Sequence, residues 1–219
     1  MHDETLLYIE DDAQRKLFYR FTPASLISNF VPLIVILDDT GCDSLQNFEY
    51  KMWNVLTPLV HNGEEQTSSF WLGERGDFYL KDLLQKLIGE IADEYECEDH
   101  IYLYGKAKSG YGAILHGILC KANAVYAYEP KIKLEELIGS KEGDLTQFLN
   151  ASDTFPVFYL CDDAIADGGT PQEETAYFVD ACRKYDINVH VDFCAKAMDD
   201  ISEHLKTVLD FFERIDSEG

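Results

Sequence analysis

The chain has 219 residues, with 18 Lys and Arg against 41 Asp and Glu, and a formal net charge of −23. Nucleic acids and anionic membranes are bound mainly through Lys and Arg, so we expect neither as a partner. No apolar run reaches the ~18 residues of a membrane span, and the first residues lack the basic flank of a signal peptide. No linker divides the chain, so we expect a single domain over residues 1–219 and no membrane span.

The six cysteines are dispersed, without a Cys-x-x-Cys pair or a Cys/His group at zinc spacing. Several have apolar neighbours, as in Phe-Tyr-Leu-Cys at 158–161, where a thiol usually packs as a small hydrophobe. We therefore expect reduced thiols in a cytoplasmic protein, with no metal site and no cofactor.

Runs of β-branched and aromatic residues alternate with amphipathic segments, which is typical of a mostly parallel sheet covered by helices. Two early runs joined by Asp-Asp-Ala-Gln indicate an opening hairpin, and the continuous apolar run that follows is typical of a strand buried on both faces. The expected strands are 6–10, 16–21, 32–37, 69–72, 100–104, 124–128, 157–161 and 188–193. The expected helices are 78–94, 111–120, 134–149, 175–185 and 201–215.

An antiparallel start followed by strand-helix alternation predicts an α/β fold of the α/β-hydrolase type, with a mostly parallel sheet of about eight strands and helices on both faces. The connection at 129–156 is mostly one expected helix, so we expect a minimal fold without a lid domain. An open site of this kind favours a small or polymeric polar ester over a bulky lipid.

The sharpest glycine cluster follows the strand at 100–104. In the nucleophile elbow, G-x-S-x-G, small residues let a strand and a helix approach closely around one strained residue. Gly105 takes the first glycine position, Ala107 the nucleophile position and Ser109 the second glycine position. The scaffold matches and the hydroxyl is absent. A shifted frame with Ser109 as nucleophile is the weaker alternative, because it moves that residue into the first helical turn.

In this fold the nucleophile is followed along the chain by the acid and then by the base. Asp162 and Asp163 close the strand at 157–161, and His204 lies on the loop-to-helix passage after the last strand. Taken singly, such residues are often a helix cap or a helix N-terminal residue. Their joint occurrence in order favours an acid and a base, which have little use without a nucleophile. An inactivated Ser→Ala form is therefore favoured over a natural non-catalytic protein.

The oxyanion hole of such a site combines the amide after the nucleophile with one from the loop after the third strand. This rule predicts the amide of Lys108 and the amides of Asp39 or Thr40 as donors. Lysines flank the elbow and follow the next strand, so a small cationic mouth is expected in an otherwise acidic protein. Solvated lysines that merely keep loops soluble are an equally good interpretation.

The segment LYGKAKSGYGAILHGIL at 103–119, continued by ANAVYAYEP at 122–130, resembles the elbow region of α/β-hydrolase-like proteins from bacterial capsular-polysaccharide loci and of accessory-secretion proteins associated with sugar O-acetylation. In those families the elbow tends to read Gly-x-Ser-Lys/Met-Gly-Gly, and this chain departs from it at Ala107 and Ser109. The resemblance implies the roles given above for Ala107, Asp162 or Asp163, and His204.

Two functions follow from this resemblance. The first is a serine-type esterase or acyltransferase that acts through an acyl-enzyme at position 107 on a small or saccharide-linked ester. The alternative is a non-catalytic binding or scaffold protein of the same fold in glycan biosynthesis or secretion. The oligomeric state stays open.

Overall fold

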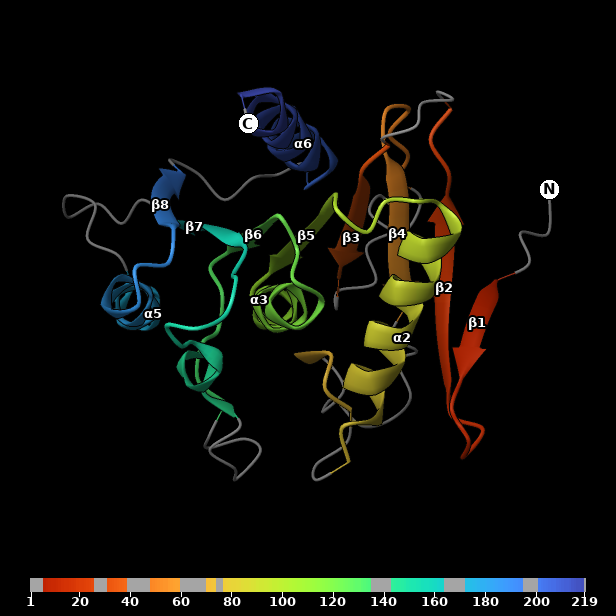
Figure 1. The fold of residues 1–219 in the computed structure, drawn as a ribbon, viewed down its shortest axis with the longest axis horizontal. Coiled ribbons are helices and arrows are strands. Elements are labelled where there is room, and N and C mark those ends of the chain that lie inside the picture. Colours follow the sequence, from red (N-terminus) through yellow and green to blue (C-terminus); the bar gives the residue numbers. More distant parts are fainter. Residues whose placement is uncertain are drawn as a thin grey trace.

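The computed structural model describes residues 6–25, 31–38, 48–59, 70–73, 77–134, 143–163, 172–194 and 201–218. Within them, eight strands form one sheet in the order β1-β2-β4-β3-β5-β6-β7-β8 (Figure 1). The strands are β1 (Leu7–Glu10), β2 (Lys16–Thr22), β3 (Leu33–Leu37), β4 (Asn54–Leu59), β5 (Ile101–Lys106), β6 (Ala124–Tyr128), β7 (Val157–Asp163) and β8 (Val189–Cys194). The helices are α2 (Tyr79–Glu94), α3 (Lys108–Cys120), α5 (Glu173–Lys184), α6 (Ile201–Glu218) and the 3₁₀-helix η3 (Leu145–Phe148).

The sheet is antiparallel at one end and parallel elsewhere. The β1–β2 hairpin and the β2–β4 pair are antiparallel, and every pair from β4 to β8 is parallel. All five residues of β3 are buried, as its continuous apolar sequence predicts. The predicted mostly parallel sheet of eight strands is confirmed. Its parallel strands end at one edge, which is where sheets of this kind bind ligands.

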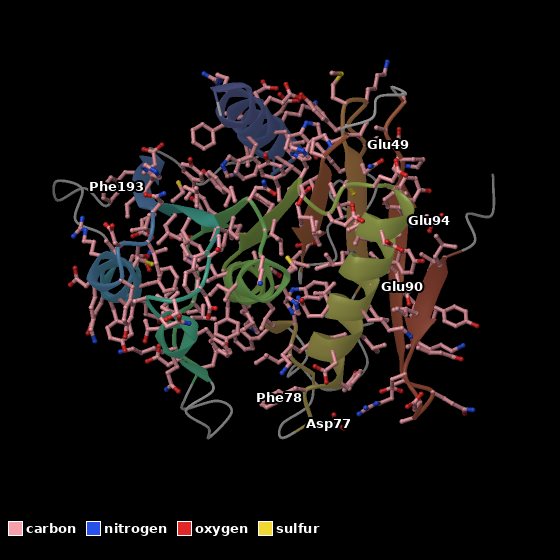
Figure 2. All side chains as sticks on the ribbon, in the orientation of Figure 1. Glu49, Asp77, Phe78, Glu90, Glu94 and Phe193 are labelled. Atoms are coloured by element: carbon pink, nitrogen blue, oxygen red, sulfur yellow. The ribbon has the colours of Figure 1, made fainter. Side chains whose placement is uncertain are left out.

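Helices cover both faces of the sheet, as expected (Figure 1). Helices α2, α3 and α5 pack on one face in a mainly aliphatic core, and α6 packs on the other face in a core that is richer in aromatic residues. Side chains fill the space on both faces, while acidic groups such as Glu90 and Glu94 of α2 are exposed to solvent (Figure 2). These two acidic groups thus lie outside the cores.

Strand β4 is not among the strands expected from the sequence. It contains Pro58, and proline is unfavourable in an interior strand. The register explains why this proline is tolerated. Strand β3 pairs with β4 only over Asn54–Leu56, so Pro58 lies where β4 has β2 as its neighbour in the sheet. Pro58 is therefore in effect at an edge.

Two predicted elements differ from the structure. The strand expected at 69–72 is wrong over its described part, because Phe70–Leu72 form a turn in which Trp71 has a left-handed φ of 62°. Of the helix expected at 134–149, residues 135–142 lie outside the described residues. Its end is the 3₁₀-helix η3, which begins where Asp144 accepts hydrogen bonds from the amide and hydroxyl of Thr146.

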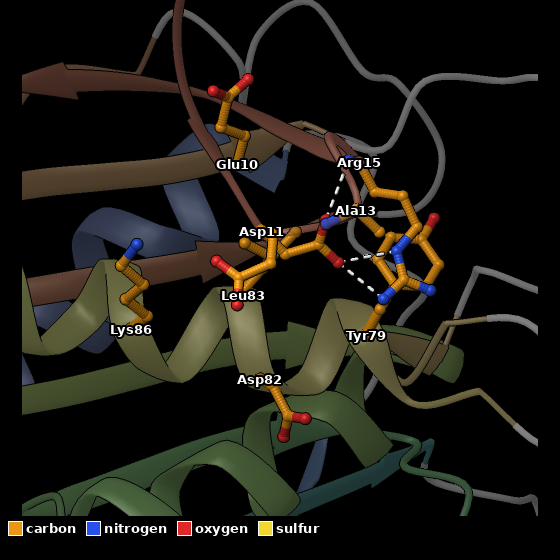
Figure 3. Close-up of a pocket in the computed structure, with 9 residues that line it drawn as sticks. Glu10, Asp11, Ala13, Arg15, Tyr79, Asp82, Leu83 and Lys86 are labelled. Carbon is orange, nitrogen blue, oxygen red and sulfur yellow. Dashed lines mark hydrogen bonds and ion pairs between the residues drawn. The ribbon is translucent and has the colours of Figure 1, made fainter.

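The β1–β2 hairpin is connected to the start of α2 by the contacts of one arginine, Arg15, beside an open cavity of about 430 Å³ (Figure 3). Arg15 donates from Nε to Asp11 Oδ2 over 2.7 Å, pairs with Asp77, and lies with its guanidinium 4.3 Å from the Tyr79 ring centroid. The bond from Arg15 lowers the pKa of the Asp11 carboxyl. Asp11 and Asp77 are therefore paired with Arg15, and the pairing connects the hairpin to the start of α2.

Candidate functional site: an elbow without a hydroxyl

The turn between β5 and α3 has the geometry of a nucleophile elbow. Ala107 has φ 51° and ψ −115°, a conformation that costs a non-glycine residue roughly 1–3 kcal/mol. Its N–H donates to the carbonyl of Tyr128 over 2.8 Å. Its carbonyl accepts from the amides of Gly110 at 3.1 Å and Lys131 at 3.3 Å. Backbone bonds to two neighbouring segments therefore hold the strained residue at the end of β5.

The small residues around the elbow are required by close approach. A Cβ added to Gly105 would lie 2.1 Å from the carbonyl oxygen of Ser109, which is backbone and cannot swing aside. A Cβ on Gly112 would lie 2.6 Å from the Trp71 ring. The glycine pattern therefore serves the packing of β5, α3 and the Trp71 turn, as the elbow interpretation requires.

Ser109 takes no part at the tip of the turn. It is buried in the first turn of α3, and its Oγ accepts a hydrogen bond from Trp71 Nε1 over 3.0 Å. The hydroxyl is thus directed to the packed side of the helix, which disfavours the shifted frame with Ser109 as nucleophile.

His204 lies in the first turn of α6, within the helix expected at 201–215 and close to the loop-to-helix passage expected for the base. Its side chain is buried against the sheet. The hydroxyl of Tyr104 lies 3.3 Å from its Nδ1, and the hydroxyl of Tyr126 lies 3.0 Å from its Nε2. The rings of these two tyrosines and of Tyr128 meet the imidazole edge to face. Tyrosines of β5 and β6 thus surround the proposed base.

Burial lowers the pKa of His204 to about 4, and the positive charge of Lys106 adds to the effect. The ring is therefore neutral at pH 7. A neutral imidazole has one donor and one acceptor nitrogen, so its two tyrosine contacts use both. In this structure His204 therefore bridges β5 and β6 through its contacts with Tyr104 and Tyr126.

The tyrosines around His204 are not among the site residues expected from the sequence. A signal was present: Tyr102 and Tyr104 in β5, and Tyr126 and Tyr128 in β6, repeat at every second position. A period of two places each pair on one face of its strand, where the register brings Tyr104 beside Tyr126. The pattern predicts a tyrosine-lined face, and only the structure shows that a histidine fills it.

Asp162 is buried and anchors helix α5. Its Oδ2 accepts from the Gln172 amide over 2.8 Å, and its Oδ1 accepts from the Thr175 hydroxyl over 2.9 Å. Phe158 and Leu160, which share its side of β7, belong to the core under α3 and α5. Asp162 therefore lies on the face opposite to α6, so the predicted Asp162–His204 pair is not formed. Asp163 pairs in register with Cys194, and its side chain lies outside the described residues.

The predicted oxyanion donors are only partly within the described residues. Lys108 is the first residue of α3, where a helix amide has no acceptor within the helix. Asp39 and Thr40 lie outside the described residues.

The predicted cationic mouth is partly neutralised. Lys131 donates to Glu174 over 3.2 Å, and the ammonium of Lys133 lies 3.5 Å from the Tyr177 ring centroid. Lys106 and Lys108 lie beside the elbow, each over an aromatic ring. These two remain the cations nearest to the turn in sequence.

The cysteines depart from the expectation of reduced thiols. Cys161, on β7, is disulfide-bonded, and its partner side chain is outside the described ones. Cys97, Cys120 and Cys182 are free. The expectation is wrong at Cys161 because separation along the chain does not report which cysteines lie together in space. A disulfide is unusual in a reducing cytoplasm, so the cytoplasmic location stays a prediction without support from the cysteines.

Two further observations concern the described part of the chain. Within it, no three His, Cys, Asp or Glu side chains gather as a metal site would need. None of its helices combines the length and apolarity needed to cross a membrane.

The fold is that of the α/β-hydrolases. It is similar to a capsule O-acetyltransferase of Neisseria meningitidis serogroup A, with TM-score 0.66, 14% identity, and coverage of 97% of this chain and 94% of that one. It is also similar to an S-formylglutathione hydrolase from Agrobacterium tumefaciens, with TM-score 0.63, 16% identity and 92% coverage of both chains. A lipase/esterase from Lactobacillus plantarum matches with TM-score 0.62, 9% identity, and 95% and 96% coverage.

No family model and no curated protein matches the sequence. The structures of the capsule O-acetyltransferase nevertheless confirm, at the level of the fold, the predicted likeness to a capsule O-acetylation protein.

Proposed function

We propose that this chain is a ligand-binding α/β-hydrolase-fold protein that holds an ester at its elbow and does not cleave it. One observation carries the proposal: both ring nitrogens of His204 are engaged by Tyr104 and Tyr126 while residue 107 has no hydroxyl. Serine-type ester cleavage needs an imidazole nitrogen that accepts the proton of the nucleophile. Residue 107 has no hydroxyl, and both ring nitrogens of His204 contact tyrosine hydroxyls.

The geometry of the turn supports an ester as the ligand. Ala107 keeps a strained conformation although it carries no reactive group. A strained conformation of this kind persists only where the surrounding structure enforces it, and such residues cluster at ligand and active sites. The amide of Lys108, at the start of α3, is placed to donate to a carbonyl oxygen beside residue 107, with the helix dipole adding to the attraction. A small ester, or one carried by a saccharide, is the proposed class, in keeping with the activities named for the structural neighbours.

A second candidate is an esterase or acyltransferase of which this chain is the Ser→Ala form. The intact elbow favours it, since a hydroxyl at position 107 would project from the tip of the turn. In that case His204 gives up the Tyr126 bond and takes the proton from the hydroxyl as Ser Oγ attacks the ester carbonyl. The acyl–oxygen bond of the substrate breaks, and the leaving alcohol takes that proton from His204. Water or a sugar hydroxyl then attacks the acyl-enzyme, takes the acyl group and returns a proton to Ser Oγ through His204.

Ala107→Ser separates the two candidates. For the binding protein we expect no fluorophosphonate label and no p-nitrophenyl acetate hydrolysis above that of the unchanged chain. Stoichiometric labelling that disappears on adding His204→Gln would instead establish the enzyme. Ser109→Ala in the Ala107→Ser background is the matched control, because that hydroxyl lies against Trp71.

Ligand binding has its own readout. In ¹H–¹⁵N NMR spectra of the unchanged chain, p-nitrophenyl acetate should shift the Lys108 amide, and p-nitrophenol alone should not. Lys108→Ala keeps the amide and removes only the charge, so an uncharged ester should still bind. No shift at the elbow with any acetate ester would overturn the binding proposal.

A further inference from the structure

A second cavity lies on the α6 face, between that helix and strands β6, β7 and β8. It measures about 470 Å³, within the usual range for small-molecule sites. Among the candidate catalytic and oxyanion residues that the structure describes, His204 lines this cavity, and Ala107 and Lys108 do not. Its lining groups that matter here are Tyr126, Tyr159, His190, Asp192, His204 and Arg214.

The strand side of this cavity carries a stacked pair of rings. His190 and Tyr159 are paired in register, and their rings lie 4.9 Å apart with an interplanar angle of 9°. The Tyr159 ring is fixed from the helix side by Phe211, edge to face at 4.5 Å. One face of the imidazole is thus covered, while the His190 side chain as a whole is exposed. The arrangement offers a pre-positioned flat ring to a ligand.

The polar groups of the cavity have opposite charges. Asp192 on β8 supplies a carboxylate, and Arg214 on α6 supplies a guanidinium. The carboxylate disfavours an anion and the guanidinium disfavours a cation. Asp192 Oδ1 accepts from the Phe193 amide and Arg214 Nε donates to the Asp210 carbonyl. A purely apolar ligand is disfavoured too, because it would still take the two charges out of water without replacing that water by its own polar groups. Neutral His204, bridged to Tyr126, adds no charge at the inner wall.

We propose that this cavity binds a neutral saccharide unit. A sugar ring has an apolar C–H face that stacks on an aromatic ring, and hydroxyls that donate to a carboxylate and accept from a guanidinium. The proposal goes beyond the elbow, because it shares only Tyr126 and His204 with the elbow proposal, depends on His190, Asp192 and Arg214, and needs no ester. A saccharide would span the strand side through His190 and the helix side through Arg214.

The test is an NMR titration of the full chain with glucose, galactose and N-acetylglucosamine. We expect at least one of them to shift signals of β8 and α6, with a dissociation constant in the millimolar range. His190→Ala and Asp192→Asn should each weaken that binding about tenfold. Both side chains are exposed, so the fold should survive. Asp93→Asn, an exposed carboxylate on α2 and the opposite face, is the matched control and should leave binding unchanged.

Absence of binding by all three sugars would overturn the inference, as would binding that both pocket variants leave unchanged. Stronger binding of benzoate or of tetramethylammonium than of every sugar would also overturn it, because either result would mean a charged ligand. The elbow proposal is judged separately: His190→Ala should leave the Lys108 shift with p-nitrophenyl acetate intact. Loss of sugar binding with that shift retained removes only this inference.

Discussion

The two faces of the sheet are built from different residues. Under α2, α3 and α5 the core is mainly Leu, Ile and Val, and its polar groups, such as Asp162 and Ser109, are tied into the packing. Under α6 the core is richer in Trp, Tyr and Phe, which pack with aliphatic residues beside His204, and it opens into a cavity. The first face assembles the elbow from backbone and close contacts. The second carries the histidine and the groups that can meet a ligand.

The two faces explain why Asp162, which has the right chain order for the acid, does not meet His204, while Asp163, the other candidate acid, stays a prediction. Neighbouring residues of a strand point to opposite faces, so a single position along β7 decides which core a carboxylate joins. Asp162 falls on the α5 side, and His204 reaches the sheet from the α6 side. Chain order alone is therefore an incomplete criterion for a catalytic pair in this fold.

The largest effect should come from breaking the elbow itself. Gly105→Ala places a Cβ against the Ser109 carbonyl, so β5 and α3 must separate or the strained turn must relax. We expect a loss of stability of about 4 kcal/mol, in the range of severe backbone and packing defects. Urea unfolding followed by circular dichroism measures it.

Gly89→Ala is the control for this substitution. Gly89 is an exposed residue of α2, and a Cβ there meets nothing within 4 Å. Alanine should stabilise the helix by about 0.5–1 kcal/mol through its better helix propensity. Equal losses in the two variants would mean that close approach at Gly105 is not what the elbow requires.

Much of this architecture is predictable from the sequence, because the signals are local. Runs of β-branched, aromatic and other apolar residues predict seven of the eight strands, and the glycine pattern predicts the turn at Ala107. The missing strand, β4, contains Pro58, whose tolerance depends on how far β3 runs alongside it. Local patterns do not carry that pairing.

The site is less predictable, because it depends on which face each group joins. The start of α6 at residue 201 is predicted, and with it the place of His204 in the first turn, but the face of the sheet that the helix covers is not. Its partners, Tyr104 and Tyr126, come from strands 100 and 78 residues away in sequence. The disulfide at Cys161 is of the same kind, since it depends on proximity in space.

A moderate effect is expected from removing the carboxylate that holds α5. Asp162→Ala leaves the Gln172 amide and the Thr175 hydroxyl without their acceptor, which costs about 2 kcal/mol for a buried pair of this kind. The same variant should leave the His204 ring signals in the NMR spectrum unchanged, because the two groups lie on opposite faces. A shift in the His204 titration on removing Asp162 would show that the two are coupled and that the separation of faces is wrong.

The smallest effect at neutral pH, and one that sharpens the role of α6, is a pH dependence of stability. Burial holds the pKa of His204 and of His116 at about 4, against an ordinary value of 6.5. Below about pH 6.5 the unfolded chain takes up protons that the folded chain refuses, so both histidines make stability fall as pH drops from about 6.5 to about 4. His204→Gln removes one of them and keeps a polar group between the tyrosines. The slope of unfolding free energy against pH should become shallower by up to about 1.4 kcal/mol per pH unit in that window.

Val208→Ala provides the comparison, because it weakens the same helix without removing a titrating group. It should lower stability at every pH and leave the slope intact. His116→Gln should flatten the slope as His204→Gln does, although its ring is held on the other face by Gln85 and the Trp71 carbonyl. If His204→Gln keeps the full slope, the imidazole takes up its proton in the folded chain near the ordinary pH. A histidine of that kind has a nitrogen available for proton transfer, and the esterase or acyltransferase interpretation of the elbow would then be the better one.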